Sequence, residues 1–152
     1  MTGSSTTRGM IIIGIMALLT GCAQNSPHPV ASNPPPVAPG PKAVWYTVAF
    51  DSNSSAIDDG GRTVIHQVVQ ALQHNPAAIA TIIGKTDTVG TADYNMHLSH
   101  LRADAVRDAL VYGDGIAADR VETRWTGERR PNVITGNDVA AASNRVVDIA
   151  IH

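Results

Sequence analysis

The chain has 152 residues, which is enough for one globular domain with appendages and short for two. Hydrophobic residues make up 43% and charged residues 16%, so a packed core is expected and extended disorder is not. With 11 basic and 13 acidic residues the formal net charge is −2, and this balance argues against nucleic acid as a partner. The single cysteine excludes a disulfide framework and a thiolate-rich metal site.

The first 22 residues have the features of an export signal. An apolar run at residues 10–19 follows a single positive charge at Arg8. It is too short for a membrane-spanning helix, which needs about 20 residues, and is typical of a secretory signal. The run ends in Leu-Thr-Gly-Cys at residues 19–22, which resembles the lipobox of bacterial lipoproteins. The resemblance implies cleavage before Cys22 and acylation of that residue, so that lipid anchors the protein in a membrane.

The sequence divides into three parts. We expect a lipoprotein signal peptide at residues 1–21, a lipidated cysteine with a proline-rich tether at 22–43, and a folded domain at 44–152. Seven of the nine prolines lie in the tether segment, and proline fixes φ and removes a backbone donor. Ala23 stands where lipoproteins retained in the inner membrane commonly have Asp. The anchor is therefore expected in the outer membrane, with the domain facing the periplasm.

The folded part alternates strand and helix patterns. Apolar residues alternate in a strand pattern or recur at helical spacing, and Asn75-Pro76 marks the end of the first helix. The expected elements are strands at 44–50, 79–83, 121–126 and 147–151, helices at 64–72 and 98–110, and a brief helix at Asp138 to Ala142. This β-α-β-α-β-(α)-β order predicts an α/β sandwich in which a four-stranded sheet with some parallel pairing packs on helices.

Three kinds of catalytic or metal site can be tested by spacing alone. A phosphate-binding loop ending in Gly84-Lys85-Thr86 would need glycine at position 79, where Ile79 stands. His97 and His100 lie one helical turn apart, but two ligands do not make a metal site, so solvent-facing histidines are the simpler interpretation. No G-x-S-x-G motif is present. We therefore expect a protein that is not an enzyme and has no metal or cofactor.

The polar loop at residues 84–90 and the following helix carry the most specific pattern. The loop reads G-K-T-D-T-V-G, and Tyr-Asn, Leu-Ser and Arg-Ala follow at 94–95, 98–99 and 102–103. This resembles OmpA-like peptidoglycan-binding domains, in which a G-H-T-D-x-x-G loop leads into a helix reading Y-N-x-x-L-S-x-x-R-A. Further matches in the family's order are Phe50-Asp51-Ser52, Gly115-Ile116, Arg120, Gly127, Pro131 and Asn144-Arg145. With the lipobox and tether, the resemblance is closest to the peptidoglycan-associated lipoproteins and implies a mixed sheet.

The resemblance implies recognition of meso-diaminopimelate in the peptide stem of peptidoglycan, which presents an ammonium and a carboxylate at one stereocentre. By residue, Asp87 would accept hydrogen bonds from the ammonium and Arg102 would take the carboxylate through paired N–H donors. The other residues implied in peptidoglycan binding are Thr88, Asn95, which would orient the loop, Leu98, and Arg145 at the rim. From spacing alone, Asp87 and Arg102 could equally pair with each other or point into water.

Two residues depart from the family pattern, and three hypotheses about the function remain open. Lys85 stands where histidine is usual, and Val146 where a second arginine is common, which would remove a cation near the groove.

The first hypothesis is a lipoprotein that anchors the outer membrane to the cell wall. A second is a subunit of a secretion or conjugation apparatus that docks through the same domain, and a Tol-type periplasmic partner is implied by the resemblance alone. A wall-modifying hydrolase is the third and least favoured.

Overall fold

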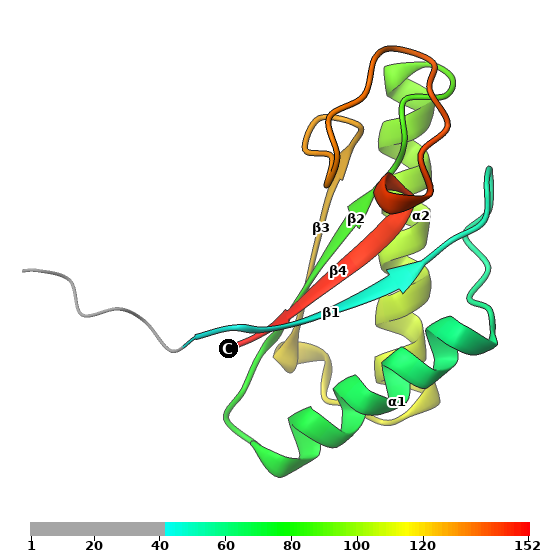
Figure 1. Ribbon diagram of the computed structural model, residues 1–152. Helices are drawn as coiled ribbons and strands as arrows, with labels where there is room; N and C mark the ends of the chain where they lie inside the picture. The colour runs from blue at the N-terminus through cyan, green and yellow to red at the C-terminus, as the bar shows by residue number, and fades with distance from the viewer. Residues whose placement is uncertain (1–41) are drawn as a thin grey trace, which may run out of the picture. The chain divides into compact units, whose positions relative to one another are not determined.

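The computed structural model of the chain describes residues 42–152. The predicted signal peptide at 1–21, the predicted lipidation site Cys22 and nearly all of the predicted tether at 22–43 lie outside the described residues. A four-stranded sheet has two long helices on one of its faces (Figure 1). The elements are β1 (Val44–Ala49), α1 (Asp59–His74), β2 (Ala80–Lys85), α2 (Ala92–Asp108), β3 (Val121–Gly127) and β4 (Val146–Ile151), with short helical turns η1 (Ala109–Gly113), η2 (Ala118–Arg120) and η3 (Ala142–Asn144).

The strand order places three loops at one edge of the sheet. The order is β1-β4-β2-β3, with β4 antiparallel to both β1 and β2, and β2 parallel to β3. Strands β1, β2 and β3 therefore run in the same direction. The loops that follow them meet at one edge, where β4 begins (Figure 1). The predicted α/β sandwich with a mixed four-stranded sheet is confirmed.

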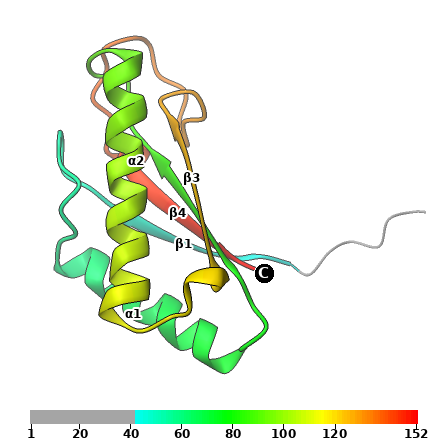
Figure 2. The same ribbon diagram turned by 180° about the vertical axis from the view of Figure 1, so that it is seen from behind.

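The hydrophobic core lies between the sheet and the two helices, which cross the near face of the sheet in Figure 2. Alternate residues of each strand point to this side, as the period of two in a strand requires. The fully buried core side chains are Val48, Ile82, Val147 and Ile149 from the strands and Val68, Leu72, Val106 and Leu110 from the helices and η1. Because the helices cover only one face, the other, which we call the outer face, is free for polar residues.

Helix boundaries follow local capping. Asp58 caps α1, since its Oδ1 accepts a hydrogen bond from Gly61 N at 2.7 Å, and the helix ends at Asn75 before Pro76, as predicted. Thr91 caps α2 in the same way through Tyr94 N. This start lies six residues before the predicted Leu98. The first turns of α2 are polar, so hydrophobic periodicity alone does not reveal them.

The brief helix predicted at Asp138 to Ala142 is wrong. A 3₁₀ turn forms at Ala142–Asn144 instead, and Asp138 has a φ of 55°, which no right-handed helix contains. The backbone N–H groups of Asp138 and Val139 donate to Thr88 O and Thr88 Oγ1, each at 3.0 Å. The donors of this segment therefore bind the loop after β2 rather than carbonyl groups of their own segment.

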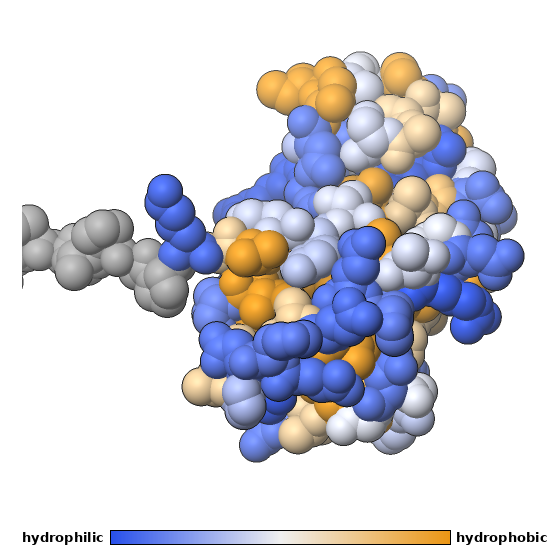
Figure 3. Space-filling view, turned by 60° about the horizontal axis from the view of Figure 1, so that its bottom comes forward, coloured by the Kyte–Doolittle hydropathy of each residue, from blue (hydrophilic) through white to orange (hydrophobic). Residues whose placement is uncertain are grey.

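The surface is mainly hydrophilic with separate apolar patches, as the face in Figure 3 shows. The most exposed large apolar side chains are Ile134, which is 92% exposed, and Tyr112 at the end of η1. Apolar residues scattered in this way are normal for a domain surface. Across residues 42–152, no helix has the length and apolar character needed to span a bilayer.

Gly84 provides a test of this packing. A Cβ at Gly84 would collide with the carbonyl oxygen of Ser99 and lie 3.1 Å from Ala103 Cβ, because β2 and α2 are in close contact there. We expect Gly84→Ala to lower the free energy of unfolding by about 3 kcal/mol, measured by urea denaturation. Gly113→Ala is the matched control, since nothing lies within 4 Å of its Cβ position. Equal stability of the two variants would contradict the close approach.

Candidate functional site

A small cavity lies at the edge of the sheet where the loops meet. Its volume is about 370 Å³. It is lined by Ser52, Asn53, Asp87, Val89, Gly90, Tyr94, Asn95 and Leu98. These residues come from the loop after β1, the loop after β2, and the first turns of α2. Sequence-distant segments are therefore brought together by the common direction of β1 and β2.

Asp87 is a buried carboxylate with one oxygen engaged. The residue is 5% exposed. Its Oδ2 accepts hydrogen bonds from Arg145 Nη1 and from the backbone N–H of Ala141, both at 3.2 Å. Within the part of the chain that the structure describes, no donor reaches Oδ1. Asp87 therefore offers a fixed acceptor to the cavity, since its second oxygen is already held in place.

Arg102 lies fully buried beneath the same loops. Nε donates to Ser54 O at 2.8 Å, Nη1 to Lys85 O at 3.1 Å and Nη2 to Asp51 O at 2.9 Å. The guanidinium also lies over the Phe50 ring, 5.3 Å from its centre. Arg102 thereby joins the loop after β1, whose Ser52 and Asn53 line the cavity, to the end of β2.

Arg102 remains a cation at neutral pH. Burial lowers the pKa of its guanidinium to about 10, while the nearby Asp87 carboxylate acts in the opposite direction and Arg145 lowers the pKa further. Asp87 and Arg102 form no ion pair with each other. The alternative that they simply pair is wrong, because the ion-pair partner of Asp87 is Arg145.

Asn95 and Leu98 belong to the face of α2 that lines the cavity, and both are buried. Asn95 Nδ2 donates to Glu128 Oε2 at 2.6 Å, so the amide is linked to the end of β3. Leu98 supplies apolar surface. Helical spacing of three to four residues places Asn95, Leu98 and Arg102 on one face of α2.

Thr88 and Arg145 are used mainly to join loops. Thr88 Oγ1 donates to Gly136 O at 2.7 Å and accepts from Val139 N, and the residue is not among those that line the cavity. Arg145 Nε donates to Phe50 O at 3.3 Å while its Nη1 binds Asp87. The six predicted residues are thus near one another, with three at the cavity and three behind it.

Lys85 and Val146, the two departures from the family pattern, lie on the outer face of the sheet. Lys85 Nζ forms an ion pair with Asp148 Oδ2 at 2.7 Å and also donates to Asn132 Oδ1. Val146 shares the face of β4 that carries Asp148, because the two lie two positions apart in the strand. Neither side chain lines the cavity. The expectation that Val146 removes a cation near the groove is not supported by this placement.

Sequence reasoning left several cavity residues out of the candidate set. Val89 and Gly90 belong to the recognised loop, and Ser52 and Asn53 to the turn after the first strand. Tyr94 donates to Asn53 Oδ1 across the cavity rim. Asn53 has a φ of 54°, a conformation that asparagine adopts more readily than most residues. A turn-forming Ser-Asn after a strand was the available signal, but only the topology places it beside Asp87.

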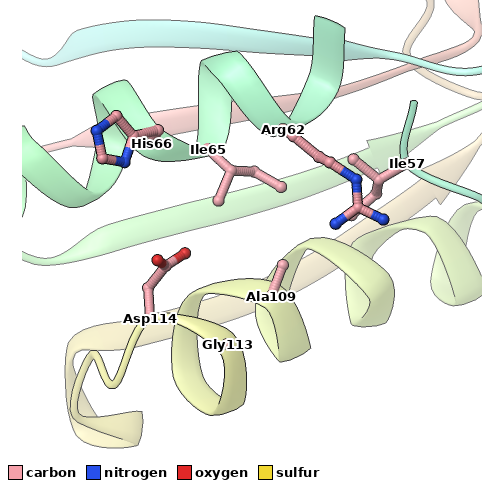
Figure 4. Close-up of a pocket in the computed structure, with 7 residues that line it drawn as sticks. All are labelled: Ile57, Arg62, Ile65, His66, Ala109, Gly113 and Asp114. Atoms are coloured by element: carbon pink, nitrogen blue, oxygen red, sulfur yellow. The ribbon is translucent and has the colours of Figure 1, made fainter. Parts of the chain in front are cut away.

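A second cavity, of about 360 Å³, lies between α1 and η1, the turn that follows α2 (Figure 4). Arg62, Ile65 and His66 of α1 face Ala109 and Asp114 across it. It contains none of the predicted site residues. His100 stacks on Trp125, with ring centres 3.9 Å apart, and no group of three metal-binding side chains occurs among the described residues.

The fold and the cavity define an α/β-sandwich domain with buried charges at its loop edge. A model of the OmpA family matches residues 49–145. The chain therefore belongs to the OmpA family, as the loop and helix motifs indicated.

Relatives with known names agree with this membership. The chain is 35% identical over 104 residues to the probable lipoprotein YiaD of Escherichia coli strain K12, covering 68% of this chain and 47% of that protein. It thus spans about half the length of that relative. It is 30% identical over 151 residues to a peptidoglycan-associated lipoprotein of Mesorhizobium japonicum, covering 91% and 89%. The crystal structure of the peptidoglycan-associated lipoprotein from Burkholderia pseudomallei has a TM-score of 0.64 and 31% identity, covering 70% of this chain and 89% of that one.

Replacing Arg102 tests its place in the structure. Arg102→Lys keeps the positive charge, but a single ammonium cannot reproduce the planar fork that binds three carbonyl oxygens. We expect the free energy of unfolding to fall by about 2–4 kcal/mol, because buried carbonyls lose their donors. Arg129→Lys is the control, because this residue is exposed and its side chain has no hydrogen-bond or ion-pair partner among the described residues. If both variants unfold at the same urea concentration as the parent, the three bonds do not stabilise the domain.

Proposed function

We propose that this protein binds peptidoglycan non-covalently through the diaminopimelate of the stem peptide and anchors the outer membrane to the cell wall. Membership of the OmpA family and the likeness to proteins named peptidoglycan-associated lipoprotein support this proposal. The observation that carries it is the unengaged Oδ1 of buried Asp87 at a cavity with two guanidinium groups close by.

The charges suit a ligand that carries both signs. The ammonium of diaminopimelate would donate to Asp87 Oδ1, a charge-assisted hydrogen bond in a site largely closed to water. The adjacent carboxylate would be stabilised by the positive charges of Arg102 and Arg145. Arg102 is fully buried and is not a lining residue, and three of its N–H groups bind carbonyls, so it would act on that carboxylate through its charge. A ligand with only one of the two charges would leave either the Asp87 carboxylate or the two arginines without a charged partner on the ligand.

The size of the cavity favours one amino acid end over a sugar chain. Its volume of about 370 Å³ is at the small end of the range of ligand pockets. Leu98 and Val89 provide apolar surface for a methylene chain, while Ser52 and Asn53 close one side. The glycan strands of the wall would remain outside, and only the stem residue would enter.

Binding of this kind needs no catalysis and little affinity at one site. Two charges must leave water to bind, which offsets much of their attraction to the protein. The wall presents the stem peptide in many copies, and an anchor in the adjacent membrane raises the local concentration of the domain. A weak, reversible contact at each site is enough to hold two surfaces together.

Anchoring requires the membrane end of the molecule. We propose that Cys22 is acylated and that residues 22–43 form a tether which lets the domain at 44–152 reach the wall. Proline-rich segments of this length extend by about 3.1 Å per residue, or roughly 60 Å in all. Several acyl chains are needed, since a single chain binds a membrane only marginally. The outer membrane is the proposed location.

Asp87→Asn tests the ammonium contact. The substitution keeps the shape and removes the charge, so we expect binding to purified diaminopimelate-type peptidoglycan to weaken about 10- to 100-fold. The measurement is co-sedimentation with insoluble sacculi over a range of protein concentrations. Asp93→Asn, at an exposed position in the first turn of α2, removes the same charge and should bind normally. Undiminished binding by Asp87→Asn, with Asp93→Asn also unchanged, would exclude the proposed site.

Cys22→Ser tests the anchor. A serine cannot receive the thioether-linked lipid, so the protein should move from the detergent phase to the aqueous phase in a detergent partition experiment. Metabolic labelling with radioactive palmitate should mark the parent protein only. Retention of the label by Cys22→Ser would show that the lipid is attached elsewhere or that the membrane contact is of another kind.

A further inference from the structure

The side-chain amide of Asn95 has a defined orientation. Asn95 is 1% exposed and lines the cavity, and its Nδ2 lies 2.6 Å from Glu128 Oε2. An ionised carboxylate can only accept hydrogen bonds, so the NH₂ group of the amide must face Glu128. The opposite orientation would bring two oxygens together. Glu128 therefore holds the NH₂ end of the amide, and Asn95 Oδ1 points away from Glu128.

The free end of that amide is its oxygen. Among residues 42–152 no donor reaches Asn95 Oδ1, and this oxygen is not one of the enclosed polar atoms that lack a partner, so part of its surface stays accessible. The same is true of Asp87 Oδ1. Two oxygen acceptors, one charged and one neutral, thus belong to the lining of one small cavity. An ammonium has three donors and suits such a pair.

The position of Glu128 does not depend on a ligand. It follows Gly127, which has a φ of 56° and whose Cβ, if present, would lie 3.1 Å from Met96 N. Gly127 N donates to Ser99 Oγ, and Gly127 O accepts from Thr86 N, both at 3.0 Å. These contacts hold the end of β3 against the first turns of α2. The carboxylate of Glu128 is thereby held beside Asn95.

We propose that Glu128 is a positioning residue which sets the charge preference of the site, because it directs Asn95 Oδ1, rather than the amide NH₂ group, toward the ligand's ammonium. The inference rests on the proposed function, because it assigns the role of two residues in recognition of the diamino acid. Without Glu128 the amide can rotate by half a turn and present its NH₂ group to the ammonium, which repels it. The site would then lose its preference for an amine without losing its fold.

The test compares two soluble probes, meso-diaminopimelate and pimelate, which has the same carboxylates and chain but no amine. Binding of each to the purified full-length protein is measured by calorimetry. Glu128→Ala should weaken binding of meso-diaminopimelate about tenfold and leave binding of pimelate unchanged or stronger. Glu128→Gln should restore most of the loss, because its Oε1 can still accept from Asn95 Nδ2. Glu122→Ala, which removes an exposed carboxylate of β3, should have no effect.

The outcomes separate this inference from the function on which it rests. If meso-diaminopimelate does not bind the parent protein, both fail. If it binds and Asp87→Asn weakens it, while Glu128→Ala matches the parent or weakens both probes equally, only the role of Glu128 and Asn95 is overturned. The side-chain amide signals of Asn95 in nuclear magnetic resonance spectra give an independent readout. They should shift in Glu128→Ala and return close to their original positions in Glu128→Gln.

Discussion

The guanidinium of Arg102 binds three backbone carbonyl oxygens, and the arrangement of the site depends on it. Strands β1 and β2 are not neighbours in the sheet, so no ladder hydrogen bonds join the loops that follow them. Arg102 reaches from α2 to Asp51 O and Ser54 O on one side and to Lys85 O on the other. A buried cation is costly unless its donors are satisfied and a countercharge is near. Here the carbonyls, the Phe50 ring and the Asp87 carboxylate offset that cost, so the positive charge of the site is part of the fold itself.

The outer face of the sheet supports the same loops from behind. Lys85 pairs with Asp148 and also binds Asn132, which lies in the long loop before β4. That loop is further held by Asn144, whose amide bonds both the N–H and the carbonyl of Val133 at 2.8 Å. Two backbone N–H groups of the loop then donate to the site: that of Asp138 to Thr88 O and that of Ala141 to Asp87 Oδ2. The side-chain contacts of Lys85 thus connect it to the site only through the loop that presents the Ala141 N–H to Asp87.

Hydrophobic periodicity predicted the main elements, because each strand and helix buries one face against a shared core. It failed at two places where polar contacts decide the structure. The first turns of α2 have few apolar residues, and the segment around Asp138 gives its N–H groups to another loop instead of to a helix. The candidate site was likewise predictable only in part. The motif predicted Asp87, Asn95 and Arg102 as candidate site residues, but no pattern reveals that Asp87 pairs with Arg145, that Arg102 lies fully buried, or that Asn95 bonds Glu128. Those relations depend on the strand order β1-β4-β2-β3, which the sequence does not encode locally.

The contacts around the cavity have one property in common: each acceptor is oriented by a bond made on its far side. Asp87 is held through Oδ2, and Asn95 through Nδ2, which leaves the Oδ1 atom of each for a ligand. Such preorganisation removes much of the entropy cost of binding, since few side chains of the protein must be ordered when the ligand arrives. This matters most for a ligand that is itself part of a flexible polymer and must lose freedom on binding. Under the proposed function, a rigid site that binds each copy of the stem peptide weakly, met many times along the wall, would give firm but reversible attachment, which suits a wall that grows and is remodelled.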